Sequence, residues 1–402
     1  MSNRRRPLLT PSHHLMLPVT RRSVLRGASV GALSLAGGGL LSACGVEGAS
    51  QSTESCTNED LSASEQVVTW SNWPAYIDPT KQADSTLGAF QSSTGITVEY
   101  TDDVNDNTDF YGKVRNQLGA CESTGRDMFT LTDWMAAKMI GLGWLQKLDK
   151  ANMPNVEANL LENLRSPSWD PERAYSVPWQ SGLTGIAYNS DEVDEVGSFQ
   201  DLLTRPDLKG RITLLSEMQD TMIFMLLLAG ADPEDFSDDE WGTALDMLTE
   251  VKYSGQVRQF TGNDYRQDLA QGNILACEAW SGDVIQLQFD NPAIKFIAPE
   301  EGLALWSDNS LVPNQATHKT NAEKLMDYYY DPQVAAELAA WVNYICPVAG
   351  AQEAMTKIAP KLAENVLIFP DDALLSNTYD FMALSPEQEQ KYQDEFARVI
   401  GA

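Results

Sequence analysis

Strand-like and helix-like segments alternate along the chain from residue 66. Short runs rich in β-branched and aromatic residues, such as "QVVTW" and "ITVEY", are followed by longer segments typical of helices, and the first of these ends at Gly95. Strands are predicted at 66–70, 96–100 and 127–131, and helices at 78–95, 107–118 and 133–143. This alternation is typical of βαβ units and predicts an α/β fold, with a mostly parallel sheet covered by helices on both faces.

The second half of the chain continues the same alternation. Residues 175–189 predict two extended runs around Ser181–Gly182. Further strands are predicted within 210–215, 273–280 and 303–313, further helices at 216–230 and 281–289, and helices dominate from Asn321 onward. With 402 residues, the chain is long enough for two α/β lobes of roughly 180 residues each.

The charge and the scarcity of histidine exclude several classes of function. The chain has 28 basic and 57 acidic residues; six arginines are the only charged residues before Cys44, so 22 basic and 57 acidic residues remain from there on. Such a surface repels phosphate and attracts cations, so no nucleic-acid binding is expected. His318 is the only histidine beyond His13 and His14, which argues against a histidine triad or zinc site, and no metal or cofactor is expected.

The first 43 residues predict an export signal rather than part of the fold. "TRRSVLRGASVGALSLAGGGLLSACG" contains paired arginines, a weakly apolar stretch and small residues before Cys44. "RRSVLR" resembles a twin-arginine signal and "LSAC" resembles a bacterial lipobox, which implies that Cys44 carries a diacylglycerol and anchors the protein to a membrane. The alternative is an ordinary cleaved signal with a free Cys44.

Residues 44–65 predict a flexible tether, because they are rich in Ser, Thr, Glu and Gly and nearly devoid of large apolar side chains. Four cysteines remain after Cys44, namely Cys56, Cys121, Cys277 and Cys346. Four cysteines outside the cell allow three disulfide connectivities. We suggest Cys56 with Cys121, and the other connectivities stay open.

Aromatic and acidic residues recur where the predicted strands end. Because ligands of open α/β sheets bind outside the carboxyl ends of the strands, these positions are the candidate site. They are Trp73, Tyr76, Thr132, Trp134, Glu217, Asp220, Trp280, Asp283, Trp306 and Asp308. No Lys or Arg stands at any of these strand ends.

Each of these residues also has a purely structural interpretation. Ser216 and Ser281 are typical helix N-caps, and acids in a first turn interact favourably with the helix dipole. Trp73 and Trp306 would then be edges of the core, and Asp308 a turn residue. As a set, however, the residues predict a cavity with aromatic walls and uncompensated negative charge.

A flexible organic cation satisfies such a cavity. Carboxylates bind ammonium groups through charge-assisted hydrogen bonds, and aromatic faces cover methylenes and attract the cation by about 0.5–2 kcal/mol each. Carbohydrate also suits aromatic platforms, but it would usually come with neutral or basic donors, which are missing here. The other classes that we consider are a carboxylate-pair glycosidase or lyase, and a binding protein for a sugar or an amino-acid derivative.

At these residues the chain resembles the spermidine/putrescine-binding proteins of bacterial ABC importers. The motifs "NWPAYI", "KGRITLL", "WSGDV" and "PEEGLALWSDNSLVP" occur in family order, and the resemblance extends from about Val67 to the region of Tyr344. It implies a periplasmic-binding-protein-like fold, in which two lobes joined by crossing strands close on the ligand. We expect one lobe from 66–182 with 307–352, and the other from 183–306 with 353–402. The last 45 residues match poorly.

The resemblance also implies roles for individual residues. Trp73 and Tyr76 would be the first-lobe aromatics, and Tyr344 a late tyrosine of the site. Thr132 and Trp134 stand where the family more often has Ser and Tyr, and Glu217 and Asp220 would be the acidic pair for an amine, exchanged relative to the common order. The remaining ligand-binding residues would be Trp280, Asp283, Trp306 and Asp308.

The function that this implies is binding rather than catalysis. We expect a monomeric lipoprotein, anchored to the outer face of the cell membrane or periplasmic, that binds spermidine or putrescine and delivers it to the permease subunits of an ABC importer. An enzyme would need a distinguishable acid and base, and no carboxylate in the sequence appears specially placed. A binder of amino acids would need an Arg for the ligand carboxylate, and none stands at these strand ends.

Overall fold

The structure is a computed structural model that describes residues 56–401. The predicted signal segment 1–43, the lipid-bearing Cys44 and the first part of the predicted tether lie outside the described residues. Within them, the alternation of strands and helices predicted from the sequence is present, in an order that begins β1–α1–β2–α2–β3–α3.

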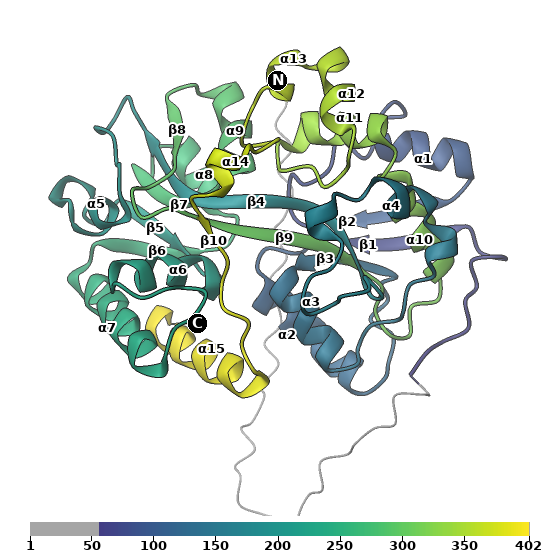
Figure 1. Cartoon of the computed structure of the whole chain (residues 1–402), viewed down its shortest axis with the longest axis horizontal. Helices are drawn as coiled ribbons and strands as arrows, with labels where there is room; N and C mark the ends of the chain where they lie inside the picture. The colour runs from purple at the N-terminus through teal and green to yellow at the C-terminus, as the bar shows by residue number, and fades with distance from the viewer. Residues whose placement is uncertain (1–55, 402) are drawn as a thin grey trace, which may run out of the picture. The chain divides into compact units, whose positions relative to one another are not determined.

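Ten strands of the described chain form one sheet (Figure 1). Eight of them follow the order β2-β1-β3-β9-β4-β7-β5-β6, while β10 pairs with β9 and β8 pairs with β4. Their bounds are β1 Val67–Ser71, β2 Thr97–Thr101, β3 Met128–Thr132, β4 Ser176–Asn189, β5 Ile212–Leu215, β6 Val257–Thr261, β7 Ala276–Trp280, β8 Ile294–Ile297, β9 Leu303–Leu311 and β10 Thr378–Tyr379.

The sheet is parallel toward its two edges and antiparallel at its centre. β1 is parallel to both β2 and β3, and β5 is parallel to both β6 and β7. The long strands β4 and β9 pair antiparallel with each other and with β7 and β3, and Figure 1 shows them running through the middle of the molecule. This confirms the predicted α/β class with crossing strands, and hydrogen bonding between β9 and β4 joins both halves into one sheet.

Helices flank the sheet, and the last of them lies against α7 (Figure 1). Their bounds are α1 Thr86–Thr94, α2 Asn107–Gly119, α3 Asp133–Gly141, α4 Pro154–Asn159, α5 Phe199–Thr204, α6 Met218–Leu228, α7 Asp238–Ser254, α8 Tyr265–Ala270, α9 Ser281–Asp290, α10 Lys319–Tyr328, α11 Pro332–Val342, α12 Ala351–Ile358, α13 Pro360–Ala363, α14 Asp372–Leu375 and α15 Pro386–Ile400.

Three local predictions differ from the structure. The first helix begins at Thr86 rather than near residue 78, because Ser85 caps it by accepting a hydrogen bond from the backbone N–H of Gly88. The two extended runs around Ser181 are a single strand, β4, with an irregularity between Pro178 and Gln180. Ser216 and Ser281 are not N-caps, since α6 and α9 begin after Glu217 and Trp280.

Buried apolar side chains gather in two main clusters. The larger cluster contains Trp70 and Phe110, and it extends through Ala351 and Ile368. The smaller cluster contains Met218 and the stacked pair Phe199 and Phe224, together with Tyr392 and Phe396 of α15. The C-terminal residues therefore divide between the clusters, with 351–368 in the larger one and α15 in the smaller one. The lobe boundaries given above remain a prediction.

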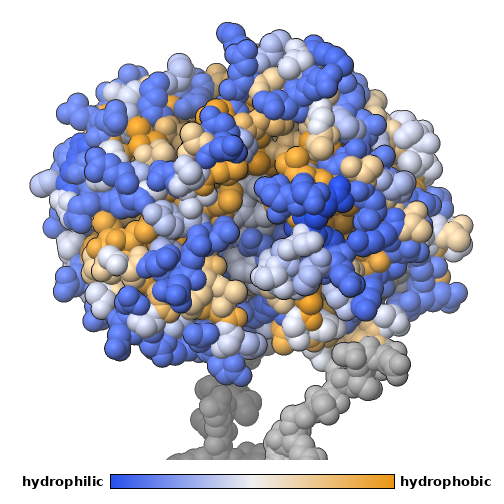
Figure 2. Space-filling model, viewed as in Figure 1, coloured by the Kyte–Doolittle hydropathy of each residue, from blue (hydrophilic) through white to orange (hydrophobic). Residues whose placement is uncertain are grey.

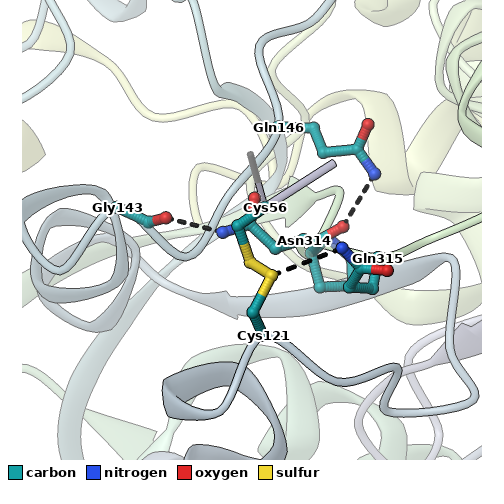
Figure 3. Close-up of a disulfide and its surroundings, with 7 residues drawn as sticks. Cys56, Cys121, Gly143, Gln146, Asn314 and Gln315 are labelled. Carbon is teal, nitrogen blue, oxygen red and sulfur yellow. Dashed lines mark hydrogen bonds between the residues drawn. A yellow bond between two sulfur atoms is a disulfide. The ribbon is translucent and has the colours of Figure 1, made fainter. Parts of the chain in front are cut away.

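The predicted tether is shorter than expected, because its last ten residues are fixed to the rest of the described chain. Cys56 forms a disulfide with Cys121, with 5.6 Å between the Cα atoms (Figure 3). The backbone N–H of Leu61 donates to Thr317 O at 2.7 Å, and Ser62 is buried. Closing a loop across 65 residues stabilises the fold by roughly 4 kcal/mol. Cys277 and Cys346 are free and buried.

The face of the protein drawn in Figure 2 is mainly hydrophilic, with apolar residues in separate groups. This agrees with the formal net charge of −29. Among the helices of residues 56–401, none is long and apolar enough to cross a membrane.

Candidate functional site

The polar and aromatic strand ends converge on one pocket. It lies where β1, β3, β5 and β7 end and where β9 crosses the sheet, as expected for an open α/β sheet. The residues that line it are Trp73, Pro74, Tyr76, Asn107, Thr132, Glu217, Asp220, Asn263, Trp280, Asp283, Trp306, Asp308 and Tyr344. Ten of the eleven residues predicted to bind a ligand are therefore brought together, although they come from positions 73 to 344 of the chain.

Five aromatic rings form a continuous wall of the pocket. Trp73 meets Trp280 edge to face, with 5.8 Å between ring centroids, and Trp280 meets Trp306 at 6.2 Å. Trp306 is 5.7 Å from Tyr344, which packs edge to face on Tyr76 at 4.9 Å. Aromatic pairs in this geometry are favourable by about 0.5–1.5 kcal/mol beyond their burial. The rings therefore form one continuous apolar surface.

Two glycines allow the rings to approach the backbone. A Cβ on Gly182 of β4 would lie 2.3 Å from the Trp306 ring, and a Cβ on Gly282 of α9 would lie 2.4 Å from the Tyr344 ring. Real Cβ atoms do not come so close to another heavy atom. The sequence "SGL" in β4 and "SGD" at the start of α9 thus fix the depth of the pocket.

Asp308 and Asp220 face the pocket without a cationic partner among the described residues. Asp308 Oδ1 accepts a hydrogen bond from the Thr132 hydroxyl at 2.8 Å. Burial raises the pKa of Asp308 to about 7. Asp220 accepts from the Thr184 hydroxyl and from the Trp280 indole, and burial raises its pKa to about 6. When ionised, both carboxylates therefore carry a charge that no cation among the described residues compensates.

Glu217 is held by Asn107, the first residue of α2. Its Oε1 accepts from the Asn107 backbone N–H at 2.7 Å and from Asn107 Nδ2 at 3.0 Å. Burial and the repulsion of nearby Asp106 raise the pKa of Glu217 well above its ordinary value, while the hydrogen bonds from Asn107 oppose that rise.

Asp283 differs from the other acids, because the protein surrounds it with partners. Its oxygens accept from Asn263 Nδ2 at 2.8 Å, from the Tyr265 hydroxyl at 2.9 Å and from the Tyr344 hydroxyl at 2.7 Å. Arg266 of α8 lies 3.6 Å away. The expectation that all the charge of the pocket is uncompensated is therefore wrong at Asp283.

One pocket donor has no hydrogen-bond partner among residues 56–401. It is the Trp73 indole N–H, which is buried. A buried polar atom without a partner costs about 1–3 kcal/mol, so this atom is suited to contact a ligand or a water molecule.

One predicted residue is not among those that line the pocket, and others were missed. Trp134 is half-buried and packs against the larger apolar cluster, because α3 begins at Asp133 and successive helical residues point in different directions. Asn107 and Asn263 line the pocket in addition. Asn263 follows β6, a strand that was not predicted from the sequence, and Asn107 begins α2 rather than ending a strand, so the pattern that identified the other residues does not reach them. In the described part of the chain, no group of His, Cys, Asp and Glu side chains is arranged to hold a metal ion.

Residues 86–369 match the family of bacterial extracellular solute-binding proteins. The chain belongs to this family. The bacterial extracellular solute-binding proteins act outside the cytoplasm, which confirms the predicted solute-binding role and extracytoplasmic location. The match includes every residue of the pocket except Trp73, Pro74 and Tyr76.

Individual members of the family are similar over most of their length. The spermidine/putrescine-binding periplasmic protein of Escherichia coli is 26% identical over 327 residues, which covers 80% of this chain and 89% of that protein. The putrescine-binding periplasmic protein of the same species is 28% identical over 349 residues, covering 81% and 89%. A solved structure from Listeria monocytogenes, assigned to a spermidine/putrescine ABC transporter, has a TM-score of 0.73 at 25% identity and covers 83% of this chain and 99% of that one. These matches confirm the resemblance and the fold predicted from the sequence.

Proposed function

We propose that this solute-binding protein takes a polyamine such as putrescine or spermidine and delivers it to an ABC importer. The observation that carries the proposal is the pairing, in one enclosed pocket, of an aromatic wall with Glu217, Asp220 and Asp308, which have no cationic partner among residues 56–401. The names of the similar proteins from Escherichia coli point to the same class of ligand.

A linear polyamine complements both the carboxylates and the aromatic wall of the pocket. Its ammonium groups neutralise the carboxylates through charge-assisted hydrogen bonds, and its methylenes lie against the aromatic rings. A sugar would leave the buried charges uncompensated. An amino acid would bring a carboxylate of its own, and no Lys or Arg of the described residues lines the pocket to receive it.

The acids of the pocket are deeply buried, which favours binding by movement of the protein around the ligand. Glu217 and Asp308 are each only 3% exposed. We propose that the two lobes, 66–182 with 307–352 and 183–306 with 353–402, open and close on the ligand about β4 and β9. Small-angle scattering should show a more compact particle with saturating polyamine, and an unchanged radius would contradict the clamp.

Anchoring is part of the proposal. Residues 1–43 would be a twin-arginine lipoprotein signal, and a diacylglycerol on Cys44 would hold the protein at the outer face of the membrane beside its permease. Cys44→Ser should move the protein from the membrane fraction to the soluble fraction. A mutant that stays bound to the membrane would contradict the lipid anchor.

We further propose that the pocket binds without catalysis and that the protein is a monomer. The acids of the pocket accept hydrogen bonds from donors of the protein, an arrangement suited to holding a cation. Polyamine recovered unchanged after prolonged incubation would support this view, and any product would contradict it.

The deciding experiment is a thermal-shift screen followed by calorimetry. Putrescine, spermidine, glucose and glutamate are tested on the mature protein and on two variants, Asp308→Asn and Asp246→Asn. Asp246 is exposed in the middle of α7, so Asp246→Asn removes the same charge at a position away from the pocket. A ligand at about 100 times its Kd stabilises the folded state by about 2.7 kcal/mol. We expect this shift for the polyamines alone, retained in Asp246→Asn and reduced in Asp308→Asn. A shift with glucose or glutamate only would overturn the proposal.

A further inference from the structure

Asn107 lies at the point where the two apolar clusters approach each other. It is the first residue of α2, whose Phe110 belongs to the larger cluster, and it is buried. Its partner Glu217 directly precedes α6, whose Met218 belongs to the smaller cluster. The neighbouring residues meet as well, since the Ser216 hydroxyl donates to Asp106 Oδ2 at 2.7 Å. This contact therefore connects parts of the chain that are 110 residues apart.

The Asn107 side chain connects two of the uncompensated acids. Its Nδ2 donates to Glu217 Oε1 at 3.0 Å and to the Thr132 hydroxyl oxygen at 2.8 Å, and its Oδ1 accepts from the Thr132 backbone N–H at 3.1 Å. The Thr132 hydroxyl in turn donates to Asp308 Oδ1 at 2.8 Å. The side-chain donors run in one direction, from Asn107 Nδ2 to Glu217 and, through the Thr132 hydroxyl, to Asp308.

The hydrogen-bond geometry explains how the side-chain amide of Asn107 can orient both Glu217 and Asp308. Two N–H donors on the same oxygen of Glu217 leave its other oxygen for a ligand. Hydrogen bonds to an ionised carboxylate favour the charged form, which opposes the cost of burial. Since Asn107 belongs to the proposed lobe that contains 66–182 and Glu217 to the one that contains 183–306, the contact exists only while the two lobes are together.

We propose that Asn107 is a positioning residue that couples closure of the pocket to the presentation of Glu217 and Asp308 to the ligand. The inference rests on the proposed polyamine-binding function and adds a residue that neither the strand-end pattern nor the aromatic wall includes. Asn107 acts through Glu217, and through Thr132 on Asp308. Its loss therefore allows the closed state to open sooner, and ligand leaves faster while association is little changed.

The test is a double-mutant cycle on putrescine and spermidine binding, with association and dissociation rates measured separately. Asn107→Ala should raise the dissociation rate about tenfold in the wild-type background and by a clearly smaller factor in the Glu217→Gln background, because only the path through Thr132 to Asp308 then remains. Asn116→Ala is the matched control, since Asn116 is an exposed residue of the same helix. It should leave both rates unchanged.

Asn107→Asp provides a second variant of nearly unchanged shape. It keeps the backbone donor but places a carboxylate against Glu217, so its loss of affinity should grow as pH rises through neutrality and should shrink in the Glu217→Gln background. Thermal melts without ligand verify that each variant folds. Equal losses in both Glu217 backgrounds, or unchanged dissociation in Asn107→Ala, would overturn the role of Asn107. Absence of polyamine binding by the wild-type protein would instead overturn the proposed function itself.

Discussion

The pocket treats its carboxylates in two opposite ways. Asp283 is only 1% exposed and is surrounded by three hydrogen-bond donors and by Arg266, so the protein itself compensates its charge. Asp308 and Asp220 are also buried, yet hydroxyl and indole groups are their only partners among the described residues. Asp283 is therefore a structural acid of the pocket, whereas Asp308 and Asp220 are available to bind a cation. It follows that Asp308 and Asp220, rather than Asp283, should carry most of the binding energy.

The largest expected effect is on ligand affinity when Asp308 is neutralised. A buried charged hydrogen bond is worth about 1.5–3 kcal/mol, so Asp308→Asn should weaken polyamine binding by about tenfold to a hundredfold or more. The unliganded protein should be no less stable at about pH 8, because the substitution removes a buried carboxylate whose pKa is raised. Calorimetry and thermal melts measure both quantities. Unchanged affinity would remove Asp308 from the site.

Asp283→Asn should show the reverse pattern, because it should lower the stability of the fold more than the affinity for the ligand. It deprives Arg266 of its carboxylate and weakens the bonds from Tyr265 and Tyr344. The Arg266–Asp283 separation is long, so we expect a loss of about 2 kcal/mol in the free energy of unfolding, below the range for a tight buried pair. Denaturant unfolding without ligand measures it. If Asp283→Asn abolishes binding while leaving stability unchanged, the division of the pocket is wrong.

The uncompensated acids also predict a dependence of binding on pH. Burial raises the pKa of Asp308 to about 7 and that of Asp220 to about 6. Near neutral pH, these carboxyl groups are therefore protonated in a fraction of the ligand-free molecules. A bound cation favours the ionised forms and expels these protons. Affinity should therefore fall by about tenfold per pH unit for each proton released as pH drops from about 7 to 6. Calorimetry in two buffers of different ionisation enthalpy counts the protons.

The stability of the ligand-free protein should change in the opposite direction. Because the pKa values of Asp308 and Asp220 are higher in the folded state than in the unfolded state, their contribution is full at low pH and is lost as pH rises through about 6 to 7. Between about pH 8 and 5.5 these groups should raise the melting temperature on acidification. The rise should be smaller in Asp308→Asn. Equal profiles in the wild type and the variant, or no proton release at about pH 6, would contradict this account.

The comparison also indicates what could be predicted from the sequence. Strand ends meet at one edge of a parallel sheet, so Trp73 could be placed with Thr132, and Glu217 with Trp280, from the alternation alone. β1 runs antiparallel to β7, so bringing these two groups together needed the resemblance to the family. Arg266 and Asn107 could not, because they come from helices, and their partners are set by contacts between distant parts of the chain. Trp134 was predicted to bind the ligand but does not line the pocket, because a helix begins between Thr132 and Trp134. The sequence pattern predicted the strands and helices, but only the tertiary structure shows that Arg266 compensates the charge of Asp283.

The smallest expected effect concerns the length of the ligand. Glu217 approaches the pocket from the start of α6, whereas Asp308 lies on β9, so a short diamine that reaches one of them gains less from the other. Glu217→Gln retains an oxygen that can accept from Asn107 but removes the charge. We expect spermidine to lose about fivefold more affinity than putrescine, the equivalent of roughly 1 kcal/mol. Glu250→Gln, an exposed residue of α7, is the control for the general loss of negative charge. Equal losses for the two ligands in calorimetry would show that Glu217 does not distinguish their lengths, and would leave the free carboxylates as a general cation site.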